Sequence, residues 1–311
     1  MLAWQEHFSP DESVVTRETA LQVPAVSRAR ALIVGAVADL PLVAYRGQER
    51  LATQPTWTYR TSGPLSPWHR LAATLDDFLF YGVSLWARQN GADGYPIDFV
   101  RVPKHRWDVD ASGRVLVDNK PAPANEVVII PGPGEGLLQT AAGTIRGARA
   151  IERAWQARVR TPIPPTLFEQ TEQEVASESE VADLLAKWRA ARQNPDSAAV
   201  GFVPYGITAK FPNAIDDSAM FIQGRNAVRL DIANQTNIPA SLLDGSTATA
   251  SLTYTTAEGQ RSSFHEQTLR YWTAPLEHRL SMDDVMPRGQ RVRFDITYQT
   301  QQAPDGEPSD D

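Results

Sequence analysis

Apolar residues recur at helical spacing near the start of the chain and again after residue 66. Within residues 23–39, Val26, Ile33 and Val37 fall on one stripe, which predicts an amphipathic helix. Ser66 precedes a proline and a second apolar run, and serine before proline is typical of a helix start. We therefore predict two helices in this region, each leading into a strand.

Short segments after each helix alternate apolar and polar residues, as half-buried strands do. The predicted strands are residues 41–46, 82–88, 97–102, 107–110, 115–117 and 127–130. Serine followed by glycine at residues 112–113 predicts a tight turn between two of them. The N-terminal half is therefore expected to be α+β with a meandering sheet.

Proline and glycine dominate residues 131–136, which read Pro-Gly-Pro-Gly-Glu-Gly. Glycine-rich loops can cradle phosphate groups. A dinucleotide-binding loop, however, needs its third glycine two residues further along, and a P-loop needs Lys followed by Ser or Thr. Leu137, Leu138 and Gln139 follow here instead. We interpret the segment as a turn that closes the first sheet.

A basic helix is predicted from Thr144, a suitable N-cap, to Arg160. Five arginines stand against the single acid Glu152, which gives a local charge of +4. A basic helix face is often simply solvated, so this pattern alone assigns no role.

The basic helix is followed by a compact insert. Its proline-rich opening, residues 161–165, cannot continue the helix. Residues 169–183 then hold six acidic residues and no basic one. The rest of the insert should contain a helix with Leu184, Leu185 and Trp188 and strand-like runs at residues 198–205 and 207–211.

Two further helices are predicted, with a loop between them. Residues 218–237 carry an apolar stripe, and residues 256–280 carry another, interrupted by Pro275, where the helix should bend. Residues 244–253 are mostly small and hydroxylated, so they have little to bury and should form a mobile loop. The stripes consist of Phe221, Val228 and Ile232 in the first helix and of Leu269, Trp272, Leu276 and Leu280 in the second.

The sequence finishes with a strand pattern and an acidic segment. Residues 291–298 alternate and predict a closing strand, whereas residues 299–311 hold four acids and no base and are expected to be disordered.

Composition narrows the class of protein. The 311 residues are 42% hydrophobic and 22% charged, close to globular averages. The chain has no cysteine, so disulfide and thiolate chemistry is excluded. Residues 1–13 show no signal peptide, and the most apolar stretch, residues 31–38, is far shorter than the roughly 20 residues that cross a bilayer. The net charge of −7 argues against tight phosphate binding.

Recognisable enzyme motifs are missing, and we expect no enzymatic activity, metal or cofactor. His265-Glu266 would begin a metalloprotease motif, but Leu269 stands where the second His must be. Ser84 lies in a strand pattern, and Trp86 replaces the glycine of a serine elbow. Three adjacent acid pairs should diverge by about 100° on a helix and are interpreted as acids at helix starts. These pairs are Asp76-Asp77, Asp216-Asp217 and Asp283-Asp284.

The order of these elements, with several local patterns, resembles the portal proteins of tailed bacteriophages, in particular the HK97-type family of siphophages. Leu252-Thr253-Tyr254 before a long helix resembles the family's segment after its tunnel loop. Residues 237–244 resemble the turn after its second stem helix, and residues 26–45 and 80–85 resemble elements of its wing. The resemblance covers roughly residues 20–298.

This resemblance implies an α+β portal fold with a mixed α/β wing, a two-helix stem, a small α/β clip, a tunnel loop and a long kinked wing helix. Only the acidic tail follows the last strand, so the family's crown is expected to be reduced or absent. The implied segments are a wing at 1–143 and 256–298, stem helices at 144–160 and 214–242, a clip at 161–213, a tunnel loop at 243–255 and a disordered acidic tail at 299–311.

The implied function is a ring of about twelve subunits at one capsid vertex, which serves as the channel for genome packaging and ejection. Implied partners are the terminase large subunit, a head–tail adaptor, the major capsid protein and double-stranded DNA that passes without sequence-specific binding, and no membrane. The implied location is the virion, after assembly in the host cytoplasm. Alternatives are a non-viral oligomeric scaffold or binding module with no DNA channel, and an unrecognised hydrolase.

The resemblance also assigns roles to individual residues. The tunnel loop would comprise Asp244, Gly245, Ser246, Thr247, Ala248, Thr249, Ala250 and Ser251. The stem charges would be Arg146, Arg149, Arg153, Arg158, Arg160, Arg225 and Arg229, and clip residues would include Phe168, Glu169, Trp188 and Tyr205. The stem arginines could meet the acidic run of a neighbouring subunit, or they could face DNA.

Overall fold

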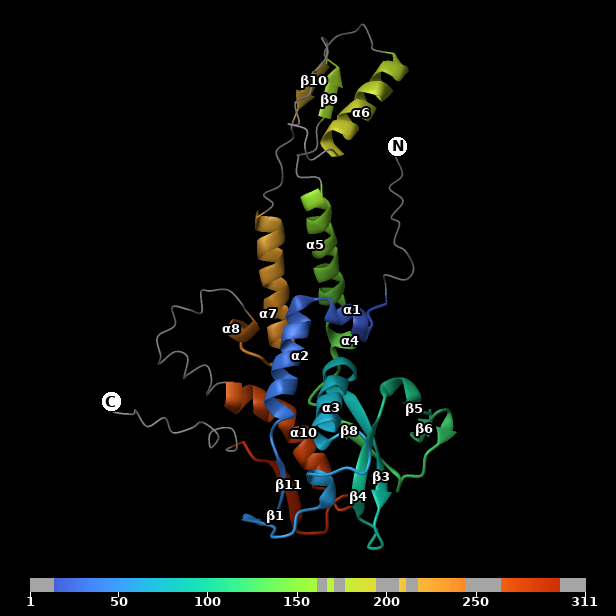
Figure 1. Cartoon of the computed structure of the whole chain (residues 1–311), viewed down its shortest axis with the longest axis vertical. Helices are drawn as coiled ribbons and strands as arrows, with labels where there is room; N and C mark the ends of the chain where they lie inside the picture. Colours follow the sequence, from blue (N-terminus) through green and yellow to red (C-terminus); the bar gives the residue numbers. More distant parts are fainter. Residues whose placement is uncertain are drawn as a thin grey trace, which may run out of the picture. The chain divides into compact units, whose positions relative to one another are not determined.

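The computed structural model describes residues 14–160, 167–170, 177–193, 207–210, 218–243 and 264–296 (Figure 1). The chain forms two compact units. Unit 1 combines residues 1–146 with residues 228–311, and unit 2 comprises residues 147–227. Unit 2 is therefore inserted into the sequence of unit 1.

The described residues of unit 1 form helices and three small sheets. Its helices are α1 (Arg17–Leu21), α2 (Pro24–Val37), α3 (Pro67–Tyr81), α4 (Leu137–Thr140), α8 (Ala240–Leu243), the π-helix η6 (Phe264–Leu269) and α10 (Arg270–Leu280). Two 3₁₀ turns are η2 (Thr56–Thr58), which precedes α3, and η3 (Lys104–Arg106), which follows β4. The strands are β1 (Leu42–Arg46), β2 (Glu49–Arg50), β3 (Val83–Asn90), β4 (Pro96–Val102), β5 (Trp107–Val109), β6 (Val115–Val117), β7 (Lys120–Pro121), β8 (Val127–Pro131) and β11 (Gln290–Phe294).

The central helix α3 begins and ends as its sequence predicts. The Ser66 hydroxyl accepts a hydrogen bond from the backbone N–H of His69. Gly82 ends the helix in the left-handed region at φ 72°, a conformation that glycine adopts without strain. The apolar face of α3, including Leu75 and Phe78, is buried.

The prediction of one meandering sheet is wrong. β3 is the centre of an antiparallel sheet in the order β4-β3-β8, whereas β5, β6 and β7 form a separate sheet. β8 returns to pair with β3, with Ser84 opposite Ile130, instead of continuing from β7. A second core around Leu85 and Trp107 fills the space between the two sheets. Alternation identifies strands but carries no information about which strands pair.

A third sheet joins distant parts of the sequence. β11 pairs antiparallel with β1, which also pairs with β2, so the order is β11-β1-β2. α10 packs next to β11, and the backbone N–H of Phe294 donates to Glu277 Oε1 at 2.9 Å. The predicted apolar stripe of α10 is confirmed, because Leu276 and Leu280 are fully buried, and Pro275 lies inside the helix.

Residues 131–136 pack tightly against the C-terminal end of α3. The Gly132 N–H donates to the Gly82 carbonyl at 2.8 Å. A Cβ at Gly136 would lie 2.1 Å from the carbonyl oxygen of Phe80, so only glycine fits there. The interpretation as a turn is confirmed, and its glycines serve close backbone approach.

Unit 2 contains most of α5 (Ala142–Arg160), followed by β9 (Leu167–Gln170), α6 (Glu178–Gln193), β10 (Ile207–Lys210), the π-helix η4 (Ser218–Gln223) and the start of α7 (Gly224–Thr236). Helix α5 begins at Ala142, so Thr144 lies in its first turn and the expected N-cap is wrong. Strand β9 was not predicted. The expected strand at 198–205 lies outside the described residues, as do the segments 256–263 and 297–311.

Candidate functional site

Helices α5 and α7 lie side by side in unit 2 (Figure 1). Gly224 makes their approach possible, because a Cβ there would lie 3.0 Å from Ile151 Cδ1. Arg225 crosses from α7 to α5, where it forms an ion pair with Glu152 and its guanidinium lies 4.7 Å from the Trp155 ring centre. Arg225 is therefore engaged within its own subunit.

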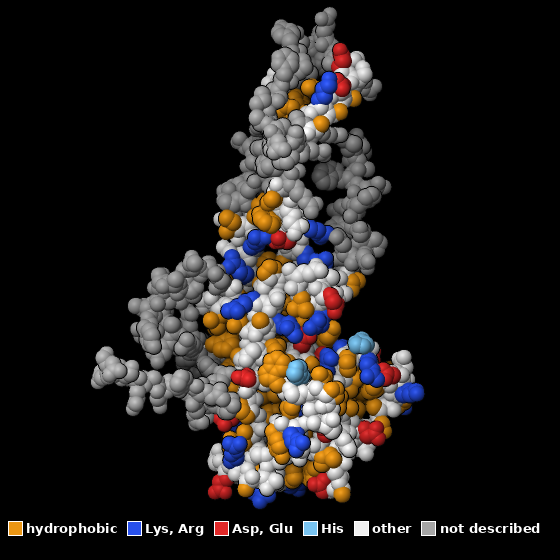
Figure 2. Space-filling view, viewed as in Figure 1, with side chains coloured by type: hydrophobic (Ala, Val, Ile, Leu, Met, Phe, Trp, Pro, Cys, Tyr) orange, Lys and Arg blue, Asp and Glu red, His pale blue; other side chains and the backbone are white. Residues whose placement is uncertain are grey.

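The surface of this helix pair is basic. Figure 2 shows blue Lys and Arg side chains over α5 and α7 with little red among them. Arg149 is half-buried, and its carbonyl accepts from Arg153 Nε at 3.4 Å. The side chains of Arg158 and Arg160 lie outside the described part of the helix. The other predicted stem arginines, Arg146 and Arg229, are present on the described parts of α5 and α7.

The predicted clip residues come together in a small cluster. β9 and β10 pair antiparallel, with Glu169 opposite Thr208. Phe168 packs edge-on against Trp188 of α6 with ring centres 5.2 Å apart. Glu169 also forms an ion pair with Lys210. Tyr205 lies outside the described residues.

The predicted tunnel loop, Asp244 to Ser251, also lies outside the described residues, which end at Leu243 and resume at Phe264. The described segments on either side of residues 244–263 are hydrogen-bonded to each other. Thr268 Oγ1 donates to the Asn237 carbonyl at 2.6 Å, and Trp272 Nε1 donates to the Thr236 carbonyl at 3.0 Å. Asn237 adopts φ 54°, which turns the chain between α7 and α8. The two ends of residues 244–263 are thus joined at a fixed base.

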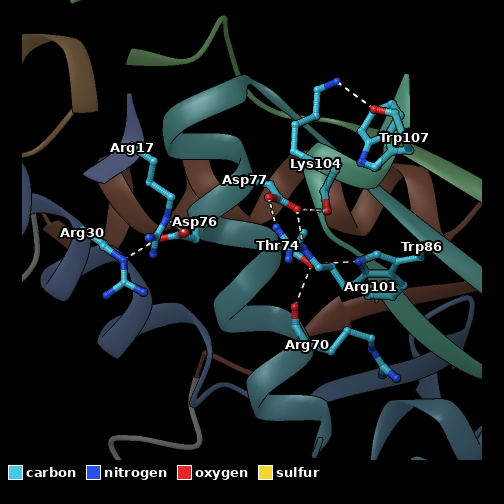
Figure 3. A network of polar contacts seen from close by, with 11 residues as sticks. Arg17, Arg30, Arg70, Thr74, Asp76, Asp77, Trp86, Arg101, Lys104 and Trp107 are labelled. Atoms are coloured by element: carbon cyan, nitrogen blue, oxygen red, sulfur yellow. Dashed lines mark hydrogen bonds and ion pairs between the residues drawn. The ribbon is translucent and has the colours of Figure 1, made fainter. Parts of the chain in front are cut away.

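A buried ion network in unit 1 holds its helices together (Figure 3). Asp76 of α3 accepts a hydrogen bond from Arg17 Nε of α1 at 2.5 Å and another from Arg30 of α2. One carboxylate therefore ties three helices together.

The neighbouring Asp77 points to the other side and binds β3 and β4. Arg101 Nε donates to Asp77 Oδ2 at 2.8 Å and a second guanidinium nitrogen pairs with Oδ1, while Ser84 Oγ donates to Oδ2 at 2.7 Å. Burial raises the pKa of Asp77, and the contacts with Arg101 act in the opposite direction.

Arg70 is a third buried charge. It donates to the carbonyls of Phe99 at 2.9 Å and Trp57 at 2.5 Å, and its guanidinium lies 4.9 Å from the Trp86 ring centre. Burial lowers the pKa of Arg70 to about 10, and Asp98 at 3.9 Å acts in the opposite direction.

The interpretation of the acid pairs as helix starts is wrong for the described residues. Asp76-Asp77 lies in the interior of α3, and Asp283-Asp284 follows the end of α10. Asp283 pairs with Arg288, and Asp284 pairs with Arg279. The expected divergence of adjacent side chains is confirmed for Asp76 and Asp77, which bind different arginines. Asp216-Asp217 lies outside the described residues.

The described residues show no group of His, Asp and Glu that could hold a metal ion. No helix in the described ranges has the length and apolar character required to cross a membrane.

Comparison with known families decides the identity. The family model for the phage portal protein matches residues 24–303. The chain belongs to the phage portal protein family. As a portal protein it is a ring-forming structural component of the capsid, and the predicted portal fold is confirmed. The non-viral scaffold is not favoured.

Solved structures show the same portal fold. An HK97-family phage portal protein from Corynebacterium diphtheriae is 28% identical, with a TM-score of 0.77 over 94% of this chain and 99% of that one. A chain from the neck of a native gene transfer agent particle, computed with C12 symmetry, is 16% identical. Its TM-score is 0.59, and the match covers 95% of this chain and 86% of that one. A chain from a native gene transfer agent virion has the same identity and TM-score over 94% and 88%. Curated protein sequences give no match to this portal protein.

Sequence reasoning singled out the stem and clip residues but missed the charged network of unit 1. Its one sequence signal is that two acids interrupt the apolar run between Leu75 and Phe78. A polar pair inside an apolar helix face indicates buried partners.

Proposed function

We propose that twelve copies of this portal protein close into a ring at one capsid vertex and that the genome enters and leaves through its central channel. The observation that carries the proposal is the family match over residues 24–303. The structural match to an HK97-family portal protein, which covers 99% of that chain, supports it. Twelvefold closure is supported by the neck computed with C12 symmetry. Such a ring needs a heterologous interface, in which the rotation that relates neighbouring subunits brings the last subunit back into contact with the first.

The segment Asp244 to Ser251 is proposed as the narrowest part of the channel wall. It offers one charge, Asp244, among small and hydroxylated side chains. A wall along which DNA slides must avoid several Arg or Lys contacts, because phosphate contacts multiply into strong, salt-dependent binding. The hydrogen-bonded base formed by Asn237, Thr268 and Trp272 supports a loop of defined position.

The basic first stem helix, residues 144–160, is proposed to meet the acidic residues 169–183 of a neighbouring subunit. Arg225 of α7 binds Glu152 and Trp155 of its own chain. Charge attraction between adjacent subunits would specify their order around the ring. The alternative, in which the arginines face DNA, is an outcome of the test below.

The clip is proposed to dock the terminase large subunit during packaging and the head–tail adaptor afterwards. The Phe168–Trp188 contact and strands β9 and β10 supply its small core. Unit 1 would contact the major capsid protein. Assembly is proposed to occur in the host cytoplasm, and the chain itself performs no reaction.

Ring formation is tested by electron microscopy and native mass measurement of the chain co-expressed with its capsid and terminase proteins. The expected particles are twelve-subunit rings with a hole about as wide as a DNA duplex. A monomer or compact dimer under these conditions would contradict the proposal.

The interface is tested with Arg149→Glu combined with Arg153→Glu, compared with the exposed control Lys120→Glu. We expect the double variant to lose rings at low salt and the control to keep them. Intact rings at low and high salt, with altered DNA packaging, would assign these arginines to the channel instead.

A further inference from the structure

Three arginines lie on one face of sheet β11-β1-β2. Tyr45 in β1 stands opposite Arg50 in β2 and opposite Arg291 in β11. Residues directly opposite in antiparallel strands point to the same side, and Arg293 shares that side because it lies two residues from Arg291. We call Tyr45, Arg50, Arg291 and Arg293 the basic sheet face.

The other face of this sheet is apolar and covered. Ala44 and Val292, which are paired across the strands, are 0% and 1% exposed. The sheet therefore buries one side in unit 1. On the other side Arg50 and Arg291 are exposed, whereas Arg293 is half-buried and Val43, which lies opposite Arg293, is 2% exposed.

The arginines of the basic sheet face form none of the ion pairs found among the described residues, although Asp295 follows Arg293 by two residues and lies on the same side. Arg293 donates a hydrogen bond to the amide oxygen of Gln48 at 3.5 Å. Like charges in neighbouring strands repel one another, so an anionic occupant would stabilise this arrangement.

A matching anion follows in the same chain. We propose that the acidic segment 299–311 binds the basic sheet face, either in its own subunit or in a neighbouring copy. The segment contains Asp305, Glu307, Asp310 and Asp311 and no Lys or Arg. It begins five residues after Phe294, the last residue of the strand that carries Arg291 and Arg293.

The geometry of the tether allows this contact. About ten residues of extended chain span roughly 33 Å, whereas three strands cover about 10 Å. Attachment to β11 also gives the segment a local concentration on the order of millimolar, so weak individual ion pairs suffice. The carboxylates would then occupy a surface that could otherwise bind DNA phosphates. This last consequence rests on the proposed function, whereas the docking does not.

Cross-linking tests the contact directly, because the chain has no cysteine. Gln48→Cys lies in the turn beside the basic sheet face and is combined with Glu307→Cys and a short bismaleimide. The matched control combines Glu307→Cys with Ser112→Cys, which lies in the turn between β5 and β6. We expect cross-linking at least fivefold faster for the first pair, and loss of this excess at about 0.5 M salt, where charges are screened.

The position of the segment follows from the mass of the product, since a link within one subunit leaves a monomer and a link between subunits gives a dimer. Replacing Arg50, Arg291 and Arg293 by Gln should remove the excess rate. Equal rates for the two cysteine pairs, or an excess that survives these three replacements, would overturn the proposal.

A binding experiment distinguishes the acidic segment from DNA as the occupant. A fluorescent duplex of about 20 base pairs is titrated with the chain and with a full-length variant carrying Asp305→Asn, Glu307→Gln, Asp310→Asn and Asp311→Asn. We expect the variant to bind the duplex several-fold more tightly, and the three arginine replacements to cancel this gain. Equal affinity of the chain and the variant would show that the segment does not cover the face and would overturn the docking, while ring formation would remain unaffected.

Discussion

Asp77 and Arg101 form a two-point ion pair that joins α3 to β4, and the Asp77 side chain is 1% exposed. Truncation by Asp77→Ala leaves the Arg101 guanidinium without its carboxylate. Breaking one side of a buried pair costs about 3–5 kcal/mol, so we expect a loss of this size in the free energy of unfolding, measured by urea denaturation. The control Asp283→Ala removes a carboxylate that is 65% exposed and should change stability by less than about 0.5 kcal/mol. Similar losses for both variants would show that burial does not set the strength of these pairs.

Asp77 and Asp98 should respond to acid in opposite directions. Burial raises the pKa of Asp77. Burial acts in the same direction on Asp98, but hydrogen bonds from Ser62 and from the Phe99 backbone outweigh it and lower the pKa of Asp98. With an unfolded pKa of about 3.9 for both, the contribution of Asp98 to stability is present above that pH and is lost as pH falls through its folded pKa. For Asp77 the sign is opposite: the pH-dependent part of its contribution is full below about pH 3.9 and is lost as pH rises through its folded pKa, because ionising the buried carboxyl costs desolvation energy that the pair with Arg101 only partly offsets.

Carboxyl NMR titration should therefore place the midpoint of Asp98 below that of Asp77. Unfolding from pH 2.5 to 6 should show a smaller acid-induced loss of stability for Asp98→Asn than for the unchanged chain. The reverse order of midpoints would contradict the assignment of the hydrogen bonds at Asp98.

Gly136→Ala should be severely destabilising. The new Cβ would lie 2.1 Å from the carbonyl oxygen of Phe80, and both contacting segments are backbone that cannot rotate away. Overpacking costs typically about 1–3 kcal/mol, and this contact is at the upper end of that range or above it. Gly147→Ala is the matched control, because nothing lies within 4 Å of its Cβ in helix α5. The free energy of unfolding of this control, measured by thermal denaturation, should rise by up to about 1 kcal/mol, since alanine favours the helix. Equal melting temperatures for the two variants would refute the backbone contact.

Thr268→Val tests the hydrogen bond that joins the two described segments on either side of residues 244–263. The change keeps the shape of the side chain but removes the hydrogen bond to the Asn237 carbonyl. Thr268 is 1% exposed but Asn237, which carries the carbonyl, is exposed, so water can replace the lost bond and the change should cost about 0.5–1.5 kcal/mol of stability. Hydrogen exchange should rise in the flanking residues 236–243 and 264–269 and remain unchanged in β3. A uniform rise over unit 1 would indicate general destabilisation instead.

Local features of the fold could be predicted from the sequence. The Ser66 cap and the stripe that contains Leu276 follow from spacing alone and are confirmed, whereas helix α10 continues through Pro275 and the bend expected there stays a prediction. These signals are local because each depends on neighbours within a few residues.

Partners far apart in the sequence could not be predicted. Alternation marks β1 and β11 as strands but cannot show that Ala44 lies opposite Val292. The sequence does not identify the arginines that pair with Asp76 and Asp77, because an ion pair between distant residues depends on tertiary packing. For the same reason the pairing of Arg225 with Glu152 could not be predicted from the sequence.

The pairing of β1 with β11 has a consequence for biosynthesis. Leu42 leaves the ribosome early, yet its partner Phe294 is added only after all of unit 2 has been translated. During this interval the edge of β1 that later binds β11 remains unpaired, and an unpaired edge is a site for aggregation. Nascent chains stalled before residue 290 should therefore depend on chaperones, and unit 2 has the opportunity to fold before unit 1 is complete.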